Sequence, residues 1–246
     1  MILKVLGSSS HGNCYIFENE SEALILECGV SFKDVKKALD FNLQKVVGCV
    51  ITHEHKDHCK AVQDILKARV PVYASAGTIS AMNPQGYFLP LIVEAGVVFR
   101  IGNFKILPFD VKHDCAEPLG YMIQHEETGN VLFATDTYYL PNTFQGLNNI
   151  LIECNYRIDI LERNIEAGAI PEVVKNRTLE SHMSFHTCRD ALLANDLSAV
   201  NNVVLIHLSG DNSNAKEFQE GIRKATGKTV PVAAPGMTIN FNKTPF

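Results

Sequence analysis

Residues 52–58, Thr-His-Glu-His-Lys-Asp-His, constrain this chain more than any other stretch. The preceding segment, 45–51, is short, apolar and rich in β-branched residues, which predicts a buried strand. The following segment, 61–68, spaces its apolar residues as a helix does. So dense a cluster of metal-binding residue types, in a chain with nine histidines, indicates a metal site rather than a solvated loop. The candidate ligands in the cluster are His53, His55, Asp57 and His58.

The spacing within the cluster suggests how two ions are shared. Alternate residues of an extended segment project to the same side, so His53 and His55 can face one ion together. The turn into the helix then presents Asp57 and His58 toward a second ion nearby.

Three more polar residues follow apolar, strand-like segments: His113, Asp136 and His207. Loops at the carboxyl ends of strands commonly converge on a functional site. Taken singly, each residue has a simpler explanation, because a lone histidine there is often an edge residue and a lone aspartate a turn former. Their order along the chain, combined with the 52–58 cluster, favours a shared site.

The His-x-His-x-Asp-His stretch and these three residues resemble the metallo-β-lactamase-fold hydrolases over almost the whole chain. The resemblance implies His53, His55 and His113 on one metal, Asp57, His58 and His207 on the other, and Asp136 bridging them. Nitrogen and oxygen ligands without thiolate suit Zn²⁺ first, with Mn²⁺ as the alternative. Two such ions activate water at neutral pH and stabilise attacking and leaving oxygens, which is machinery for hydrolysis. Many family members carry an aspartate where this chain has Glu27, so the support of the ligand loops is expected to differ here.

The remaining pattern predicts the fold class α/β (α+β). Strand-like hairpins turned at 102–103 and 126–130 alternate with helical segments, in two similar halves. This favours an αββα sandwich of two mixed sheets packed face to face with helices outside. No linker or low-complexity segment interrupts residues 1–246, which predicts one domain. The expected helices are 32–39, 61–68, 158–167, 188–197 and 215–225, and the closing strands are 230–233 and 237–241.

Composition limits the class of protein, its cellular location and the partners it can bind. An apolar fraction of 46% describes a globular chain with a large core, and no apolar run approaches the length of a membrane span. The N-terminus lacks the features of a signal peptide, and seven scattered cysteines form no C-x-x-C pair, which favours reduced thiols and a cytoplasmic location. A net charge of −5 argues against an extended basic surface for duplex nucleic acid, although bound dications reverse the charge locally.

Two further residues narrow the reaction. Glu153 follows an apolar strand and His182 precedes a helix, as do the proton-shuttling pair of RNase Z enzymes. A departing phosphodiester oxygen needs a proton, and a histidine held by a carboxylate can donate it near neutral pH. The simpler reading makes His182 a surface residue and Glu153 a salt-bridging acid. The resemblance assigns Asp57, Glu153 and His182 to the catalytic machinery.

Four short motifs narrow the family: Gly-Ser-Ser-Ser-x-Gly-Asn at 7–13, Asp-His-Cys-Lys at 57–60, Glu-x-Asn-Tyr at 153–156 and His-Met-Ser at 182–184. Together they look most like the small WalJ/YycJ-type group, which resembles RNase Z and is associated with 5′-exonuclease action on DNA. The Gly/Ser/Asn loop 7–13 could offer donors to a phosphate, although such turns are common. Only 70 residues lie between Asp136 and His207, too few for an inserted cap domain, and no tRNA-gripping arm is visible. The resemblance also allows for a homodimer. The candidate substrate-binding residues are Ser8, Ser9, Asn13, Ser184 and His186.

The leading hypothesis is therefore a dinuclear-metal phosphodiesterase acting on nucleic-acid ends. The runner-up is the same chemistry on a cyclic nucleotide, which the acidic net charge favours and which would suit a phage enzyme that disables signalling. A lactonase or thioesterase has no evident use for Glu153 and His182. A non-catalytic metal-binding module is disfavoured, because structural zinc sites usually close with four ligands and this chain offers seven.

Overall fold

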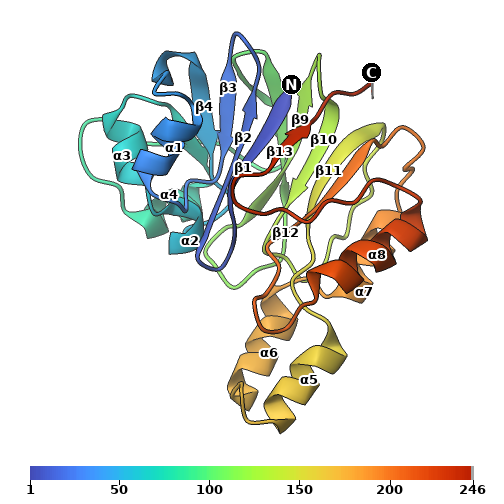
Figure 1. Cartoon of the computed structure of the whole chain (residues 1–246). Helices are drawn as coiled ribbons and strands as arrows, with labels where there is room; N and C mark the ends of the chain where they lie inside the picture. The colour runs from blue at the N-terminus through green and yellow to red at the C-terminus, as the bar shows by residue number, and fades with distance from the viewer. Residues whose placement is uncertain (245–246) are drawn as a thin grey trace.

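Two β-sheets pack face to face in the computed structural model, which describes residues 1–244 (Figure 1). One sheet has seven strands in the order β13-β1-β2-β3-β4-β5-β6, and the other has six in the order β12-β11-β10-β9-β8-β7. The strands of the first are β1 Ile2–Ser9, β2 Gly12–Glu18, β3 Ala23–Leu26, β4 Val46–Val50, β5 Val72–Ala74, β6 Leu91–Ile92 and β13 Thr238–Asn240. Those of the second are β7 Phe99–Ile101, β8 Phe104–Asp110, β9 Leu119–His125, β10 Gly129–Ala134, β11 Leu147–Glu153 and β12 Asn202–Ile206.

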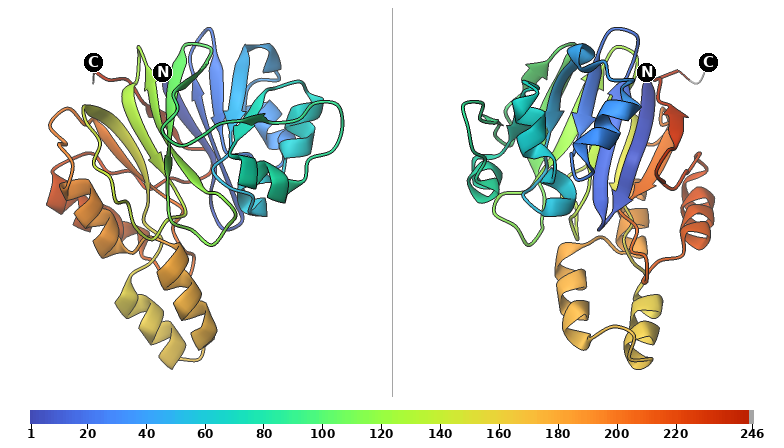
Figure 2. Two further views of the ribbon diagram at one scale, coloured as in Figure 1. Left: turned by 180° about the vertical axis from the view of Figure 1, so that it is seen from behind. Right: turned by 60° about the vertical axis from the view of Figure 1, so that its left-hand side comes forward.

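Helices cover the outer faces of both sheets, which confirms the predicted αββα sandwich. The first sheet is covered by α1 Phe32–Ala38, α2 Lys56–Cys59, α3 Val62–Lys67 and α4 Ala76–Met82, with a 3-10 turn at Leu43–Lys45. The second is covered by α7 Phe185–Leu193 and α8 Ala215–Thr226. The remaining two helices, α5 Ile158–Glu166 and α6 Glu172–Ser181, project together from one end of the sandwich (Figure 2).

The side chains of strand β2 contribute to two apolar layers, one on each face of its sheet. Successive side chains of a strand point to opposite faces. Tyr15 and Phe17 therefore enter the layer between the sheets, while Cys14 and Ile16 pack under the helices of the first sheet. Because both of its faces are covered, every residue of β2 is buried, and its sequence lacks the polar alternation of a half-exposed strand.

Several expected boundaries differ from the structure. Strand β1 continues to Ser9 and β2 begins at Gly12, so only two residues of the expected 7–13 loop form the turn. Helix α7 begins at Phe185 instead of residue 188, because the side chain of Ser184 accepts a hydrogen bond from Thr187 N and caps the helix earlier. The expected strand 230–233 forms only isolated bridges to β12.

Four helices or strands were not predicted, namely α2, α4, β6 and α6, and neither was the 3-10 turn at Leu43–Lys45. Helix α6 is polar around most of its circumference, because it leaves the sandwich and has no core to face, so its sequence lacks an apolar stripe. Strand β6 is two residues long, too short for a periodic signal.

The structure also shows the state of the cysteines and whether any helix could span a membrane. Within residues 1–244, all seven cysteines are free and six are buried, with Cys115 partly exposed, as reduced core thiols should be. No helix in this described part of the chain combines the length and apolar character needed to cross a bilayer.

Candidate metal centre

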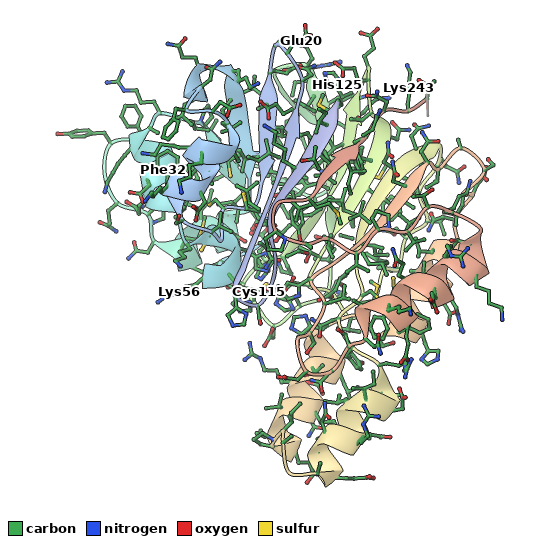
Figure 3. All side chains as sticks on the ribbon, viewed as in Figure 1. Glu20, Phe32, Lys56, Cys115, His125 and Lys243 are labelled. Carbon is green, nitrogen blue, oxygen red and sulfur yellow. The ribbon has the colours of Figure 1, made fainter. Side chains whose placement is uncertain are left out.

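The clustered side chains gather at one end of the sandwich, where strands of both sheets terminate. The 52–58 segment leaves β4, and the segments that carry His113, Asp136 and His207 leave β8, β10 and β12. Figure 3 marks this end with Lys56 and Cys115, beside the projecting α5–α6 pair, while His125 marks the opposite end. The topology therefore places four separate loops around one site.

The first cluster contains three histidines whose ring nitrogens converge. His55 Nδ1 lies 3.1 Å from His53 Nε2 and 3.1 Å from His113 Nε2. Two nitrogen ligands of a tetrahedral Zn²⁺ ion lie about 3.3 Å apart, given Zn–N bonds of about 2.0–2.1 Å. The observed spacing therefore fits one metal ion shared by the three rings.

The second cluster combines carboxylates with histidines. Asp57 Oδ2 lies 3.3 Å from His58 Nε2 and 3.4 Å from His207 Nε2. Asp136 Oδ1 lies 3.4 Å from His58 Nε2, while its other oxygen, Oδ2, lies 3.6 Å from His113 Nε2 in the first cluster. Asp136 thus faces both clusters, one carboxylate oxygen toward each.

Strained backbone presents two of these ligands. Asp136 and His207 both adopt left-handed conformations, with φ of 46° and 54°, which non-glycine residues seldom adopt. Local hydrogen bonds hold them there: Thr135 Oγ1 donates to Asp136 Oδ1 at 2.6 Å, and His207 N donates to Ser8 Oγ at 3.0 Å. The strain aims both side chains into the site immediately after their strands end.

Hydrogen bonds from the opposite side of the rings orient the histidines. His113 Nδ1 donates to the Ser181 carbonyl at 2.7 Å, so its Nε2 is left free to bind a metal. His53 Nδ1 lies 2.8 Å from Thr52 Oγ1 and is oriented in the same way. These contacts select the ring nitrogens that converge in the first cluster.

Glu27 supports the second cluster from behind. Its fully buried carboxylate accepts hydrogen bonds from Thr52 N, at 3.2 and 3.4 Å, and lies 3.6 Å from His58 Nδ1. Burial raises the pKa of Glu27, and the neighbouring His58 and Thr52 offset part of that rise. The glutamate that replaces the more usual aspartate thus reaches both the 52–58 segment and a clustered histidine.

The two clusters differ in electrostatics. Burial holds the pKa of His53 well below its usual range and lowers that of His113, so both rings are neutral ligands. Burial also disfavours a charged His207, but Asp136, Asp57 and Glu153 raise its pKa to about 10. His58 is raised well above its usual range, chiefly by Asp136 and Glu27 against burial. The carboxylates of the second cluster therefore favour positive charge on its two histidines, and a cation bound there takes the place of those protons. Together the two clusters indicate a site for two divalent metal ions.

Glu153 and His182 meet beside the second cluster. His182 Nδ1 donates to Glu153 Oε1 at 2.7 Å, and Glu153 Oε2 accepts from Thr137 N and Met183 N, each at 3.0 Å. Burial would lower the pKa of His182, but Glu153 and Asp136 raise it. The structure thus brings together a buried carboxylate and a partly exposed imidazole whose pKa that carboxylate raises.

A cavity of about 450 Å³ opens over these groups, and its lining includes Asp57, Asp136, His182 and His207. Of the serines in the 7–13 segment, it is Ser10 that lines the cavity. Sequence reasoning also missed Asn155 and Arg177, which line it too. Asn155 lies two residues after Glu153, the last residue of β11. This position just after a strand was the one feature of the sequence that could have identified Asn155 as a site residue.

The five residues expected to bind substrate have other contacts, and none of them lines this cavity. Ser8 bonds Tyr15 and His207 N, and Ser9 lies in strand β1 with its hydroxyl accepting from His11 N. Asn13 is fully buried, and its Nδ2 donates to Asp57 Oδ2 at 3.2 Å. Ser184 caps α7, and the exposed His186 packs against Phe185. These residues brace the site or lie outside it.

Comparisons with known proteins agree with this geometry. The family model described as "Beta-lactamase superfamily domain" matches residues 24–208. The chain is 31% identical over 230 residues to "Exodeoxyribonuclease YycJ" of Bacillus anthracis, covering 87% of this chain and 84% of that protein. It is 29% identical to "Exodeoxyribonuclease WalJ" of Streptococcus pneumoniae, covering 87% and 83%. Among solved structures, the metallo-β-lactamase-fold protein YhfI of Bacillus subtilis superposes with a TM-score of 0.72 at 14% identity, over 97% of this chain and 98% of that one.

Proposed function

The chain belongs to the beta-lactamase superfamily domain family, and from this premise we propose that it is a dinuclear-metal phosphodiesterase that digests DNA from its 5′ end. The observation that carries the proposal is the 2.7 Å contact between Glu153 and His182 beside the clustered metal-binding groups. A phosphodiesterase needs a proton donor for its leaving oxygen, whereas a lactonase or thioesterase has no evident use for one. The names of the YycJ and WalJ relatives support DNA as the substrate and exonucleolysis as the mode.

The ligand assignment follows the clusters. In this proposal, Zn²⁺ or Mn²⁺ ions occupy both sites, and when bound they supply activated water at neutral pH and stabilise charge on the phosphoryl oxygens. Asp57 lies at the cavity wall, held by Asn13, and so belongs to the reaction centre as well as to the ligand set. The ligands are His53, His55 and His113 for one metal, Asp57, His58 and His207 for the other, and Asp136 for both.

The chain's own acid is His182. Glu153 accepts a hydrogen bond from Nδ1, so the other ring nitrogen, Nε2, is left to act on substrate. The raised pKa of His182 favours a proton on the ring. His182 Nε2 therefore donates that proton to the departing oxygen of the phosphodiester, while Glu153 stabilises the imidazolium beforehand and orients the ring.

A cyclic nucleotide is the second candidate substrate. The projecting pair of helices, which borders the cavity, carries five acidic and three basic residues between positions 158 and 181. Such a surface does not attract a long polyanion and so favours a small ligand. This alternative requires the same metals and the same acid.

We further infer a homodimer built on the edge strand β6. Its two residues, Leu91 and Ile92, are exposed at the free edge of the seven-stranded sheet, next to exposed Tyr87, Phe88 and Leu89. An exposed apolar edge strand can pair with a strand of another molecule, and two copies can pair there around a two-fold axis.

Two further parts of the proposal concern the domain and the location. One hydrolase domain spanning residues 1–246 is supported by the single apolar layer between the sheets. A reducing cytoplasm is supported by the free thiols.

The test is a product analysis with purified protein in Zn²⁺ or Mn²⁺. One tube holds a 5′-phosphorylated single-stranded DNA and a cyclic nucleotide, and Asp57→Ala and His182→Ala run alongside. Mononucleotides released progressively from the 5′ end, and lost in both variants, are the expected result. Ring-opened nucleotide with intact DNA would establish the small-molecule alternative, and no turnover of either substrate would overturn the phosphodiesterase.

A further inference from the structure

Helix α6 presents one face to the cavity. Val174, Arg177, Thr178 and Ser181 all line it, and their spacing of three, four and seven residues places them on one side of a helix. Val173 is 75% exposed, more than Val174 at 38%, and it does not line the cavity. One face of α6 thus forms the cavity wall. Val174 lies on this face, and the neighbouring Val173 lies outside it.

This wall is apolar at its far end. Ile170 and Pro171, which precede α6, line the cavity together with Val174, whereas the metal-binding groups lie beyond the other end of the helix. With a rise of 1.5 Å per residue, Val174 lies about 12 Å along the helix axis from His182. The apolar surface is therefore too far from the reacting centre to serve the scissile phosphate, yet it opens into the same cavity.

Contacts join α6 to α5 and to the segment that carries His113. Lys175 Nζ pairs with Glu162 of α5 at 2.9 Å, and Asn164 Nδ2 of α5 donates to the Asp211 carbonyl at 2.8 Å. At the other end of α6, the Ser181 carbonyl accepts from His113 Nδ1 at 2.7 Å. The bond between the Ser181 carbonyl and His113 thus places the end of α6 directly beside the first metal-binding cluster.

Arg177 lies between the apolar surface and the metal-binding groups. Its guanidinium is exposed and pairs with Asp114 through Nε at 3.0 Å. An exposed ion pair of this kind exchanges readily, and a guanidinium binds a phosphate through two parallel hydrogen bonds. Arg177 can therefore leave Asp114 for a phosphate bound in the cavity.

We propose that this face of α6 is a nucleoside subsite that takes an unpaired base of the substrate, an inference that rests on the proposed function and names its substrate class. The base packs against Ile170, Pro171 and Val174, while Arg177 binds a neighbouring phosphate. A base that lies against a side-chain wall has left its own stack and pair, so the subsite selects single-stranded ends over duplex. Because all four DNA bases present a similar flat face, a subsite that contacts this face accepts any base.

The test separates nucleoside binding from phosphate binding. Calorimetry on the metal-loaded protein measures the Kd of deoxyadenosine 5′-monophosphate and of inorganic phosphate. Val174→Asp and the uncharged Val174→Asn are compared with Val173→Asp, the neighbouring position outside the cavity. We expect both Val174 variants to weaken nucleotide binding, Val174→Asp about tenfold, or about 1.4 kcal/mol. We expect phosphate binding in Val174→Asn, and both affinities in Val173→Asp, to stay unchanged.

Kinetics on single-stranded DNA give the second readout. Arg177→Gln is expected to raise KM with little change in kcat, whereas Arg163→Gln on α5 leaves both unchanged. Unchanged nucleotide affinity in the Val174 variants of an enzyme that still digests DNA would overturn the subsite and leave the proposed function standing. Val174-dependent nucleotide binding without turnover of any phosphodiester would overturn the function and keep the subsite. Equal weakening by Val173→Asp would also overturn the subsite.

Discussion

Oε1 of Glu153 lies 2.7 Å from His182 Nδ1 and 3.1 Å from His207 Nδ1. One carboxylate oxygen therefore holds both the proposed proton donor and a proposed metal ligand. Because Glu153 ends β11, where Oε2 is also bonded to two backbone amides, it cannot shift without moving both rings. The arrangement ties the acid to the metal-binding groups through a single rigid residue.

His182→Ala is predicted to lower kcat on DNA by about 10²–10⁴-fold, the usual contribution of a general acid. The loss should be much smaller with a p-nitrophenyl phosphodiester, because that leaving group departs without a proton. His186→Ala, four residues along and exposed, is the matched control and should leave both rates unchanged. An equal loss on the two substrates, with normal metal content, would contradict the role of acid.

Metal binding is predicted to release protons. The pKa of His207 is raised to about 10 and that of His58 lies well above its usual range, so both rings carry protons at pH 7 without metal. A metal binds only the unprotonated nitrogen, so affinity should fall as pH falls. Calorimetric titration of Zn²⁺ in buffers with different ionisation enthalpies measures the release, which His207→Ala should reduce. A binding enthalpy that is the same in every buffer would contradict it.

The sequence predicted the site better than its surroundings, for a physical reason. His53, His55, Asp57 and His58 are adjacent in sequence, so their pattern is visible without a fold. Glu153 and His182 could be singled out only by resemblance, because their contact spans 29 residues and depends on how β11 meets α7. The αββα class followed from hairpins and helices whose apolar spacing reflects the two sheets.

The cavity wall could not be predicted in the same way. Helix α6 faces solvent and the cavity instead of a core, so hydrophobic periodicity, the main signal for a helix, is missing from 172–181. Ser8 and Asn13 look like loop residues in the sequence, but strands β1 and β2 run almost to the turn, which directs them into the supporting hydrogen bonds. Residues of this kind need the three-dimensional structure to be assigned.

Glu27→Asp is predicted to weaken metal binding about 10–100-fold, as the loss of a supporting group behind a ligand typically does. Asp would be one methylene too short to reach Thr52 N from the left-handed backbone at position 27, where φ is 63°. Thr52 N would then lose its partner, and His53, the next residue, would lose its alignment. Competition with a fluorescent chelator measures the affinity. Unchanged affinity would show that the 52–58 segment is held without Glu27.

At the opposite end of the sandwich, Glu22 links the sheets in a way that predicts acid sensitivity. His125 Nε2 of β9 lies 3.0 Å from Glu22 Oε1, and Asn103 donates to both carboxylate oxygens, at 2.8 and 3.0 Å. Burial opposes ionisation, but these hydrogen bonds from Asn103 and His125 outweigh it and lower the pKa of Glu22. A lowered pKa means that the ionised group stabilises the fold above its unfolded pKa of about 4.3, and that this contribution is lost as pH falls further.

Glu22→Gln should therefore reduce the free energy of unfolding at pH 7. The difference from wild type should shrink as the pH falls from about 4.3 through the lowered pKa of the folded protein, below which the wild-type carboxylate is also protonated. Urea unfolding of metal-free protein, at pH 7 and at an acid pH below the lowered pKa of Glu22, measures the difference in the free energy of unfolding between wild type and variant at each pH. The use of metal-free protein excludes effects of the distant metal-binding clusters. The exposed Glu20, two residues away, provides the control variant Glu20→Gln, which should show no such pH-dependent difference. If the wild type and Glu22→Gln differed by the same amount at both pH values, the ionised carboxylate would not be what joins the sheets at this end.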